Sequence, residues 1–244
     1  MKESVVAELV VLHVDFTDNA DAWLWLGGLE ADPQVKRDHF ERVLALRPGD
    51  PDATAGLARM NMILHDFPTA NILPGNTLAA PKFKDGEQLR TYDYVVANPP
   101  FSDKTWSTGL TLGDSGKGDP FQRFAWGVPP AKQGDYAYLL HIVRSLKSHG
   151  KGACILPHGV LFRGNAEADI RRALVRKGYI KGIIGLPANL FYGTGIPACI
   201  IVLDKENAAA RKGVYMIDAS KGFIKEGNKN RLRAQDIHKI VDTF

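Results

Sequence analysis

The chain has 244 residues, of which 45% are hydrophobic, 24% charged and 9% aromatic, a globular composition that excludes a disordered or collagen-like protein. Its longest apolar run, Ile196 to Leu203, is too short to span a bilayer, and Glu3 and Glu8 interrupt any signal peptide. We therefore expect a cytoplasmic protein of one or two domains, with no membrane partner.

The formal net charge of +4 is distributed unevenly along the chain. Residues 1–52 carry 5 Lys/Arg against 11 Asp/Glu, whereas residues 53–244 carry 26 against 16. A shift of this size predicts a domain boundary, with an acidic segment over 1–52 and a basic domain over 53–244. The positive charge of the larger part favours a polyanionic partner such as nucleic acid.

The acidic segment is predicted to be helical. The run Trp23 to Gly27 is followed by Pro51, 28 residues after Trp23, and residues 38–47 place their apolar side chains on one helical face. This spacing resembles a single tetratricopeptide repeat over about 20–52. Any amphipathic helical hairpin is the alternative interpretation. A lone repeat has to pack its apolar face on another part of the chain or on a partner.

A third helix is predicted over 53–65, and the pattern then alternates between strands and helices. The strand-like runs are 71–73, 92–97, 152–157, 179–184, 198–203 and 214–217, and the helical runs are 136–148, 166–177 and 235–241. This alternation predicts an α/β domain with a mostly parallel, helix-covered sheet. Residues 101–134 show no period, and long loops of this kind are usually functional or disordered.

The strand predicted over 92–97 runs directly into Asn98-Pro99-Pro100-Phe101, called the NPPF turn below. In a parallel α/β sheet, ligands bind at the carboxyl ends of the strands. The side-chain oxygen of Asn98 and the carbonyl oxygen of Pro99 are two acceptors for an exocyclic amine, and the prolines hold them because their φ is fixed. Phe101 offers a face on which a flipped base stacks. The turn therefore predicts an amine methylation site, with an ordinary proline turn as the alternative.

Several longer phrases carry a resemblance to a known family. They are Leu57 to His65, Pro74 to Leu78, Val95 to Phe101, Gly134 to His141, Ile155 to Arg163, Leu186 to Cys199, Asp218 to Ser220 and Asn230 to Leu232. Over about residues 53–244 the chain resembles the modification subunit of type I restriction-modification systems, an amino-group DNA methyltransferase. The resemblance implies a Rossmann-like, S-adenosylmethionine-dependent methyltransferase sheet, whose N-terminal part is missing here and is preceded by the short tetratricopeptide-like segment.

The resemblance implies transfer of a methyl group from S-adenosylmethionine to N6 of an adenine flipped out of duplex DNA. It implies that Asn98 and Pro99 accept from the amine, that Pro100 holds the turn and that Phe101 stacks on the base. Asn76 would lie near the adenine of the cofactor, although a turn-forming Asn is the alternative there. The implied partners are duplex DNA, a specificity subunit and a restriction subunit.

The sequence departs from the family pattern at the cofactor site. We find no strand followed by a Gly-rich loop of the D-P-x-C/G-x-G-x-G type, and Gly49 stands where the family has an acid for the ribose. We therefore expect a fusion or remnant of marginal stability, inactive if the loop is lost. Two alternatives stay open: a non-catalytic protein-interaction or DNA-binding remnant, and a protein glutamine methyltransferase, against which Phe101 in place of Tyr argues.

Other residues allow both a functional and a structural interpretation. His158 is either near the pocket or a turn histidine, and Asp135 is either a site residue or a helix N-cap. Cys154 and Cys199 lie in strand-like runs without metal-ligand spacing, so we expect core packing and no metal site.

Two larger sets are equally open. The aromatic residues of the long loop either close over a flipped base or anchor the loop; they are Trp106, Phe121, Phe124 and Trp126. The basic residues that follow it either contact DNA phosphates or form a solvated helix face. These are Arg163, Arg171, Arg172, Arg176, Lys177 and Lys181.

Overall fold

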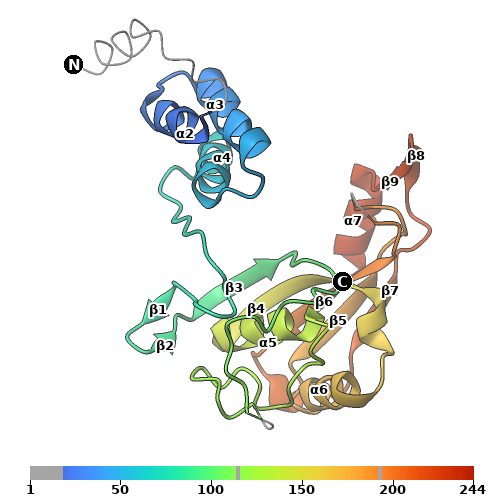
Figure 1. Cartoon of the computed structure of the whole chain (residues 1–244). Coiled ribbons are helices and arrows are strands. Elements are labelled where there is room, and N and C mark those ends of the chain that lie inside the picture. Colours follow the sequence, from blue (N-terminus) through green and yellow to red (C-terminus); the bar gives the residue numbers. More distant parts are fainter. Residues whose placement is uncertain (1–18, 114–115, 192–193) are drawn as a thin grey trace, which may run out of the picture. The chain divides into compact units, whose positions relative to one another are not determined.

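A computed structural model describes residues 19–113, 116–191 and 194–244 (Figure 1). The chain divides into two compact units, Met1–Asn76 and Thr77–Phe244. Within the described residues, no helix combines the length and the apolar character that crossing a membrane requires.

The described part of the first unit consists of helices α2 (Ala20–Leu29), α3 (Pro33–Leu46) and α4 (Pro51–Leu64). Each helix begins after an Asn or Asp whose side chain accepts hydrogen bonds from the first-turn N–H groups. The ring of Phe40 in α3 packs against the bare backbone of Gly27 and Gly56. A Cβ at either glycine would lie 2.7 or 2.6 Å from this ring, so only glycine allows so close an approach.

The first unit extends further than the segment that the charge shift predicts. The helix expected over 53–65 is α4, and it packs on α2 and α3 although its charge and its sequence resemblance assign it to the basic domain. The boundary between the two compact units therefore follows Asn76, whereas the change in net charge along the sequence follows residue 52. The identity of residues 20–52 as a tetratricopeptide repeat stays a prediction.

The second unit is built on a five-stranded sheet with the order β3-β4-β6-β5-β7 (Figure 1). The strands are β3 (Tyr92–Ala97), β4 (Leu146–Pro157), β5 (Ile180–Gly185), β6 (Ala198–Asp204) and β7 (Tyr215–Asp218). β3 pairs parallel with β4, and β5 pairs parallel with β7. β6 runs antiparallel to both of its neighbours. The carboxyl ends of β3, β4, β5 and β7 consequently meet at one edge.

The alternation predicts a mostly parallel sheet, and four of the five strands do share one direction. The sheet is nevertheless mixed, because β6 runs against them. The reason lies in residues 186–197, which connect β5 to β6 and contain no helix among their described residues. The crossover between parallel strands is usually a helix, and this connection, which has none in its described part, joins β5 to an antiparallel β6.

Helices and hairpins complete the second unit. They are α5 (Asp135–Ser145), η1 (His158–Leu161), α6 (Asn165–Arg176), η2 (Ala208–Ala210), α7 (Ala234–Thr243), the hairpin β1 (Lys84–Asp85) with β2 (Gln88–Leu89), and the hairpin β8 (Ile224–Glu226) with β9 (Lys229–Arg231). The strand expected over 71–73 does not form. The helix expected over 136–148 ends at Ser145, because Leu146 already pairs with Tyr92 as the first residue of β4.

The hydrophobic core of this unit joins the sheet to α5 and α6. Alternate residues of β4 point into it, as the two-residue period of a strand requires. The core includes Leu139, Leu140 and Val143 of α5, Cys154 and Leu156 of β4, Ile170 and Leu174 of α6, and Ile201 and Leu203 of β6.

The long loop over 101–134 is largely an anchored part of this unit. Trp106, Phe121 and Phe124 are buried, which supports the structural interpretation of these aromatic residues. Arg123 is fully buried and donates from Nη2 to Asp119 Oδ1 at 2.7 Å. Burial raises the pKa of Asp119, but the hydrogen bonds and the charge of Arg123 outweigh it and lower the pKa.

Candidate functional site

β3 carries the predicted site at its carboxyl end, and it is the least protected strand of the sheet. It pairs only with β4 among the described strands, so its other edge is open. Val95 and Ala97 pack on the core, whereas Tyr94 and Val96 are 75% and 80% exposed. The strand that leads into the NPPF turn is therefore supported on one edge and one face.

The four residues of the NPPF turn leave β3 together and line one pocket of about 560 Å³. The other lining residues are Ser102, Phe191, Thr194 and Ile196. The rings of Phe101 and Phe191 meet edge to face, with centroids 5.6 Å apart and planes at 70°. We call this space the NPPF pocket. It combines an aromatic wall with the acceptor groups of Asn98 and Pro99.

The acceptor groups of the turn are available to a ligand. The Asn98 side chain makes no hydrogen bond to another described residue, so its carboxamide oxygen keeps its full capacity to accept. Pro99 and Pro100 have no N–H group that could compete with a ligand amine for these acceptor oxygens. A planar ring bearing an NH₂ group fits this combination.

The backbone just after Phe101 is fixed by the start of α5. The N–H of Ser102 donates to Asp135 Oδ1 at 2.8 Å. The N–H of Gly134 donates to the carbonyl oxygen of Asp103 at 2.9 Å, and the hydroxyl of Tyr138 donates to Asp103 Oδ2 at 2.8 Å. Gly134 occupies the N-cap position, so Asp135 is not the N-cap residue that one interpretation of the sequence suggested.

The Phe191 wall is held by the β8–β9 hairpin. Lys229 Nζ donates to the carbonyl oxygens of Phe191 and Thr194 at 2.7 and 3.1 Å. Asn230 binds the same loop through its backbone N–H, 3.0 Å from the oxygen of Asn189, and through its side chain. Sequence reasoning missed Phe191, Thr194 and Ile196 as lining residues, although all three lie inside the family phrase from Leu186 to Cys199.

Two further candidates do not join the residues that line the NPPF pocket. Asn76, predicted to lie near the cofactor, is the last residue of the first unit. His158 begins η1 at the carboxyl end of β4, and its Nε2 is buried with no hydrogen-bond partner in the described structure.

The predicted basic set is partly structural. Arg163 binds Asp135 and Glu167, and Arg171 donates to the carbonyl oxygens of Val160 and Arg163. These two guanidinium groups are therefore committed to the fold. Arg172 forms only an exposed ion pair with Asp169.

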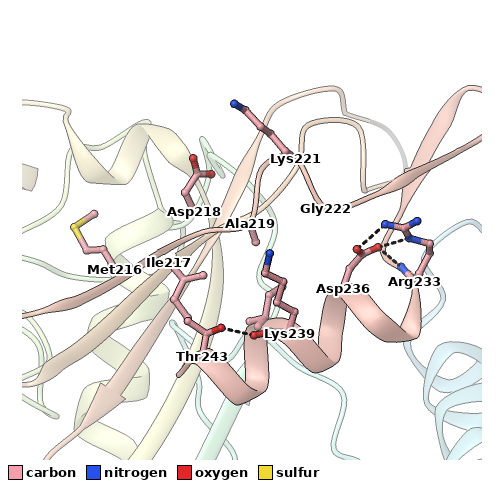
Figure 2. A pocket seen from close by; sticks show the side chains of 11 residues that line it. Met216, Ile217, Asp218, Ala219, Lys221, Gly222, Arg233, Asp236, Lys239 and Thr243 are labelled. Atoms are coloured by element: carbon pink, nitrogen blue, oxygen red, sulfur yellow. Dashed lines mark hydrogen bonds and ion pairs between the residues drawn. The ribbon is translucent and has the colours of Figure 1, made fainter.

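A second pocket, of about 520 Å³, lies between the end of β7 and α7 (Figure 2). Figure 2 shows Arg233 paired with Asp236, through bonds of 2.8 and 2.9 Å. These bonds lower the pKa of Asp236 to about 2. Asp218, Lys221 and Lys239 add one negative and two positive charges, so this pocket is close to neutral. It contains none of the predicted site residues.

No set of three or more His, Cys, Asp or Glu side chains within the described ranges is arranged to hold a metal ion. The NPPF pocket offers oxygen acceptors, the hydroxyl groups of Ser102 and Thr194, and aromatic rings as its chemical groups.

The chain is similar to known methylase subunits. It is 34% identical over 200 residues to the type I restriction enzyme MpnII methylase subunit of Mycoplasma pneumoniae, across 78% of this chain and 36% of that protein. It is 35% identical over 195 residues to the HindI methylase subunit of Haemophilus influenzae, across 77% of this chain and 40% of that protein. The chain thus spans little more than a third of the length of these relatives.

The fold agrees with this similarity. The crystal structure of a type I restriction-modification system methyltransferase subunit from Streptococcus thermophilus matches with a TM-score of 0.66 and 41% identity, over 78% of this chain and 39% of that one. This match confirms the predicted α/β methyltransferase fold. The family described as N-6 DNA Methylase matches residues 50–244, which include the NPPF turn and every strand of the sheet. The chain therefore belongs to the N-6 DNA methylase family.

Proposed function

We propose that this chain acts in a type I modification subunit that methylates N6 of adenine in duplex DNA. The observation that carries the proposal is the NPPF pocket, in which two acceptor groups and two phenyl rings meet at the carboxyl end of β3. Its volume of about 560 Å³ lies in the range of small-molecule sites and leaves room for a flipped base. A specificity subunit and a restriction subunit would be its partners, in the cytoplasm.

The chemistry follows from the groups present. An exocyclic amine presents two hydrogens, and the Asn98 oxygen and the Pro99 carbonyl oxygen each accept one. Holding both hydrogens leaves the nitrogen lone pair directed out of the ring plane, toward a methyl donor. Phe101 and Phe191 hold the ring by stacking and edge contacts. Because the prolines fix the backbone, little conformational entropy is lost when the base enters.

The methyl donor of the proposed reaction is S-adenosylmethionine, and this assignment rests only on the membership of the chain in the N-6 DNA methylase family. The described residues do not form the usual cradle for such a cofactor, a strand that turns through a Gly-rich loop into a helix. Gly27 and Gly28 lie inside α2, and the glycines between 113 and 118 follow a segment without a strand. The structure therefore supports the acceptor half of the reaction.

A non-catalytic role is the second candidate function. The open edge of β3 and the lack of a cofactor cradle among the described residues favour it. A chain of this kind would keep its DNA contacts without turnover. A protein glutamine acceptor is the third candidate, since its side-chain amide also carries an NH₂ group.

Recognition of the amine can be tested without the cofactor. The affinity of the chain for an adenine-containing single-stranded oligonucleotide is compared with its affinity for the same strand carrying purine, which lacks the amine. We expect about tenfold tighter binding of adenine, because purine leaves both acceptors unpaired. Asn98→Ala should abolish the preference. Equal affinities of the wild-type chain for the two strands would refute the base-binding role.

Turnover is tested with unmethylated genomic DNA, labelled S-adenosylmethionine and mass spectrometry of the hydrolysed products. N6-methyladenine that disappears in Asn98→Ala would establish the activity. Methylglutamine formed from a peptide acceptor, with no labelled adenine, would favour the protein methyltransferase. Amine recognition without label in any product would favour the non-catalytic role.

A further inference from the structure

The backbone turns sharply directly after Phe101. Ser102 has φ = +51°, in the left-handed region that few residues other than glycine adopt. Such a conformation persists where surrounding contacts determine it. Its N–H donates to Asp135 Oδ1 at 2.8 Å, and its hydroxyl lies 3.5 Å from Asp135 Oδ2. The direction in which the chain leaves the NPPF turn thus depends on one carboxylate.

The burial of the Asp135 carboxylate costs free energy. Asp135 is fully buried, and a buried carboxylate is unfavourable unless it is paired and hydrogen bonded. Its partner is Arg163, whose Nη2 lies 2.5 Å from Oδ2. Arg163 also donates from Nε to Glu167 Oε2 at 2.6 Å, and Glu167 is buried as well. One guanidinium therefore compensates two buried carboxylates, of which only Asp135 contacts the segment after the NPPF turn.

Both oxygens of Asp135 are in use. Oδ1 accepts from the Ser102 N–H, and Oδ2 accepts from Arg163. An amide at this position replaces one of the two oxygens with an NH₂ group, which cannot accept from Ser102 or from Arg163, so one of the two bonds is lost. The requirement for two acceptors explains why a charged residue stands at this buried place.

We propose that Asp135 is a positioning residue that fixes the turn at Ser102 and so holds Phe101 and the acceptors of the NPPF turn in their base-binding arrangement. This inference rests on the proposed function, because it assigns Asp135 to the same pocket. Asp135 does not line the pocket and acts through the backbone of Ser102. The rest of the first turn of α5 assists, because Gly134 and Tyr138 bind Asp103.

The test compares Asp135→Asn with Glu167→Gln. Both variants neutralise one buried carboxylate of the same guanidinium, but only the first alters the side chain that accepts from Ser102. We expect both to lower the thermal unfolding midpoint. Asp135→Asn should also reduce the tenfold preference for adenine over purine to about one, whereas Glu167→Gln should keep it. A preference that both variants retain, or that both lose equally, would mean that Asp135 is merely structural.

Amide hydrogen exchange gives a second readout that does not depend on base binding. In Asp135→Asn, the amides of residues 101–103 should exchange about tenfold faster, as expected for the loss of one hydrogen bond, while those of β4 keep their rates. Glu167→Gln should leave residues 101–103 unchanged. Unchanged exchange in Asp135→Asn overturns the positioning role. If Asp135→Asn speeds exchange at residues 101–103 but the wild-type chain binds adenine and purine equally well, the proposed function is overturned and the positioning of the turn by Asp135 is not.

A third variant covers the case in which Asp135→Asn does not fold. Tyr138→Phe removes the hydroxyl that donates to Asp103 and changes no charge. We expect it to fold, to speed exchange at residues 102–103 and to weaken the adenine preference about threefold. An unaltered preference together with unaltered exchange would count against control of the NPPF turn by the first turn of α5.

Discussion

Two neighbouring strands of the same sheet lie in very different surroundings. β4 pairs with β3 and β6, and its Cys154 and Leu156 are completely buried. β3 has the apolar sequence of a buried strand, yet Tyr94 and Val96 are mostly exposed, and no described strand pairs with its second edge. In doubly wound sheets, the strand that ends at the ligand crevice is usually an inner strand. Here the strand that carries the site is the outer one.

The difference shows where the rigidity of the site must come from. An inner strand is held on both edges, whereas β4 is the one described strand that pairs with β3. Burying a side chain such as Val or Leu stabilises the folded state by about 1.5–3 kcal/mol. Val96 of β3 is mostly exposed, so it provides little of this stabilisation. Fixing the NPPF turn then falls to local hydrogen bonds from α5. Substitutions in the core should therefore act on stability, and substitutions along β3 on binding.

The largest expected effect is the loss of the buried ion pair in the core. Arg123→Ala leaves Asp119 buried without its partner and removes the bond from Arg123 Nη1 to the carbonyl oxygen of Leu78. Breaking such a pair costs about 3–5 kcal/mol, so the free energy of unfolding in urea should fall by that amount. A loss below about 1 kcal/mol would show that the long loop is not part of the core.

The pH dependence of stability should also come from the core. Burial, and next the charge of Arg123, lower the pKa of His141 to about 4 from its ordinary value of 6.5. The unfolded chain therefore binds a proton between pH 6.5 and 4 that the folded chain rejects, so stability is full above pH 6.5 and falls as the pH drops to 4. The loss should approach about 3 kcal/mol.

The control for this pH dependence is His141→Gln, which keeps a polar side chain and cannot titrate. Urea unfolding at pH 7 and pH 4.5 should give a smaller difference for the variant than for the wild type. An equal difference in the two proteins would assign the acid sensitivity to other groups.

A matched pair of substitutions probes the contrast between core and edge directly. Val143→Thr and Val96→Thr make the same chemical change, at a fully buried position of α5 and at an exposed position of β3. A hydroxyl buried without a partner costs about 1–3 kcal/mol, whereas surface changes stay within about 0.5 kcal/mol. Chemical denaturation measures both. A large loss for Val96→Thr would mean that the face of β3 is covered in solution.

The smallest effect on stability is expected at Phe101. Phe101→Ala removes the ring that meets Phe191 in the NPPF pocket, and Phe101 is only half-buried. Base stacking on an aromatic side chain contributes about 1–3 kcal/mol, so binding of an adenine-containing strand should weaken about tenfold or more. The melting temperature should hardly change. Unaltered affinity would remove Phe101 from the base contacts.

Local features of the sequence predict much of the site. The strand over 92–97, its abrupt end at two prolines and the aromatic residue after them depend on neighbouring residues, and the structure forms β3 at those positions. The longer phrases predict the family, which the match over residues 50–244 confirms. The roles of Asn98 to Phe101 and of Asn76 stay predictions.

Features that depend on distant residues were beyond sequence reasoning. Phe191 meets Phe101 across 90 residues because it follows β5, whose carboxyl end lies at the same edge of the sheet as that of β3, and no periodicity reveals this pairing. Asp135 looked like a helix cap, and its contact with Ser102 joins positions 33 residues apart. The burial of Trp106 and Phe124 likewise depends on the packing of a loop without any period.

The two cysteines make the centre of the sheet open to direct observation. Cys154 in β4 and Cys199 in β6 are free and buried, and burial raises the pKa of each thiol to about 12. A thiol that is both inaccessible and protonated does not react with an alkylating reagent at neutral pH. Each labelling event therefore records a moment when β4 or β6 has opened, so the rate of modification measures how often the middle of this sheet separates, without any engineered probe.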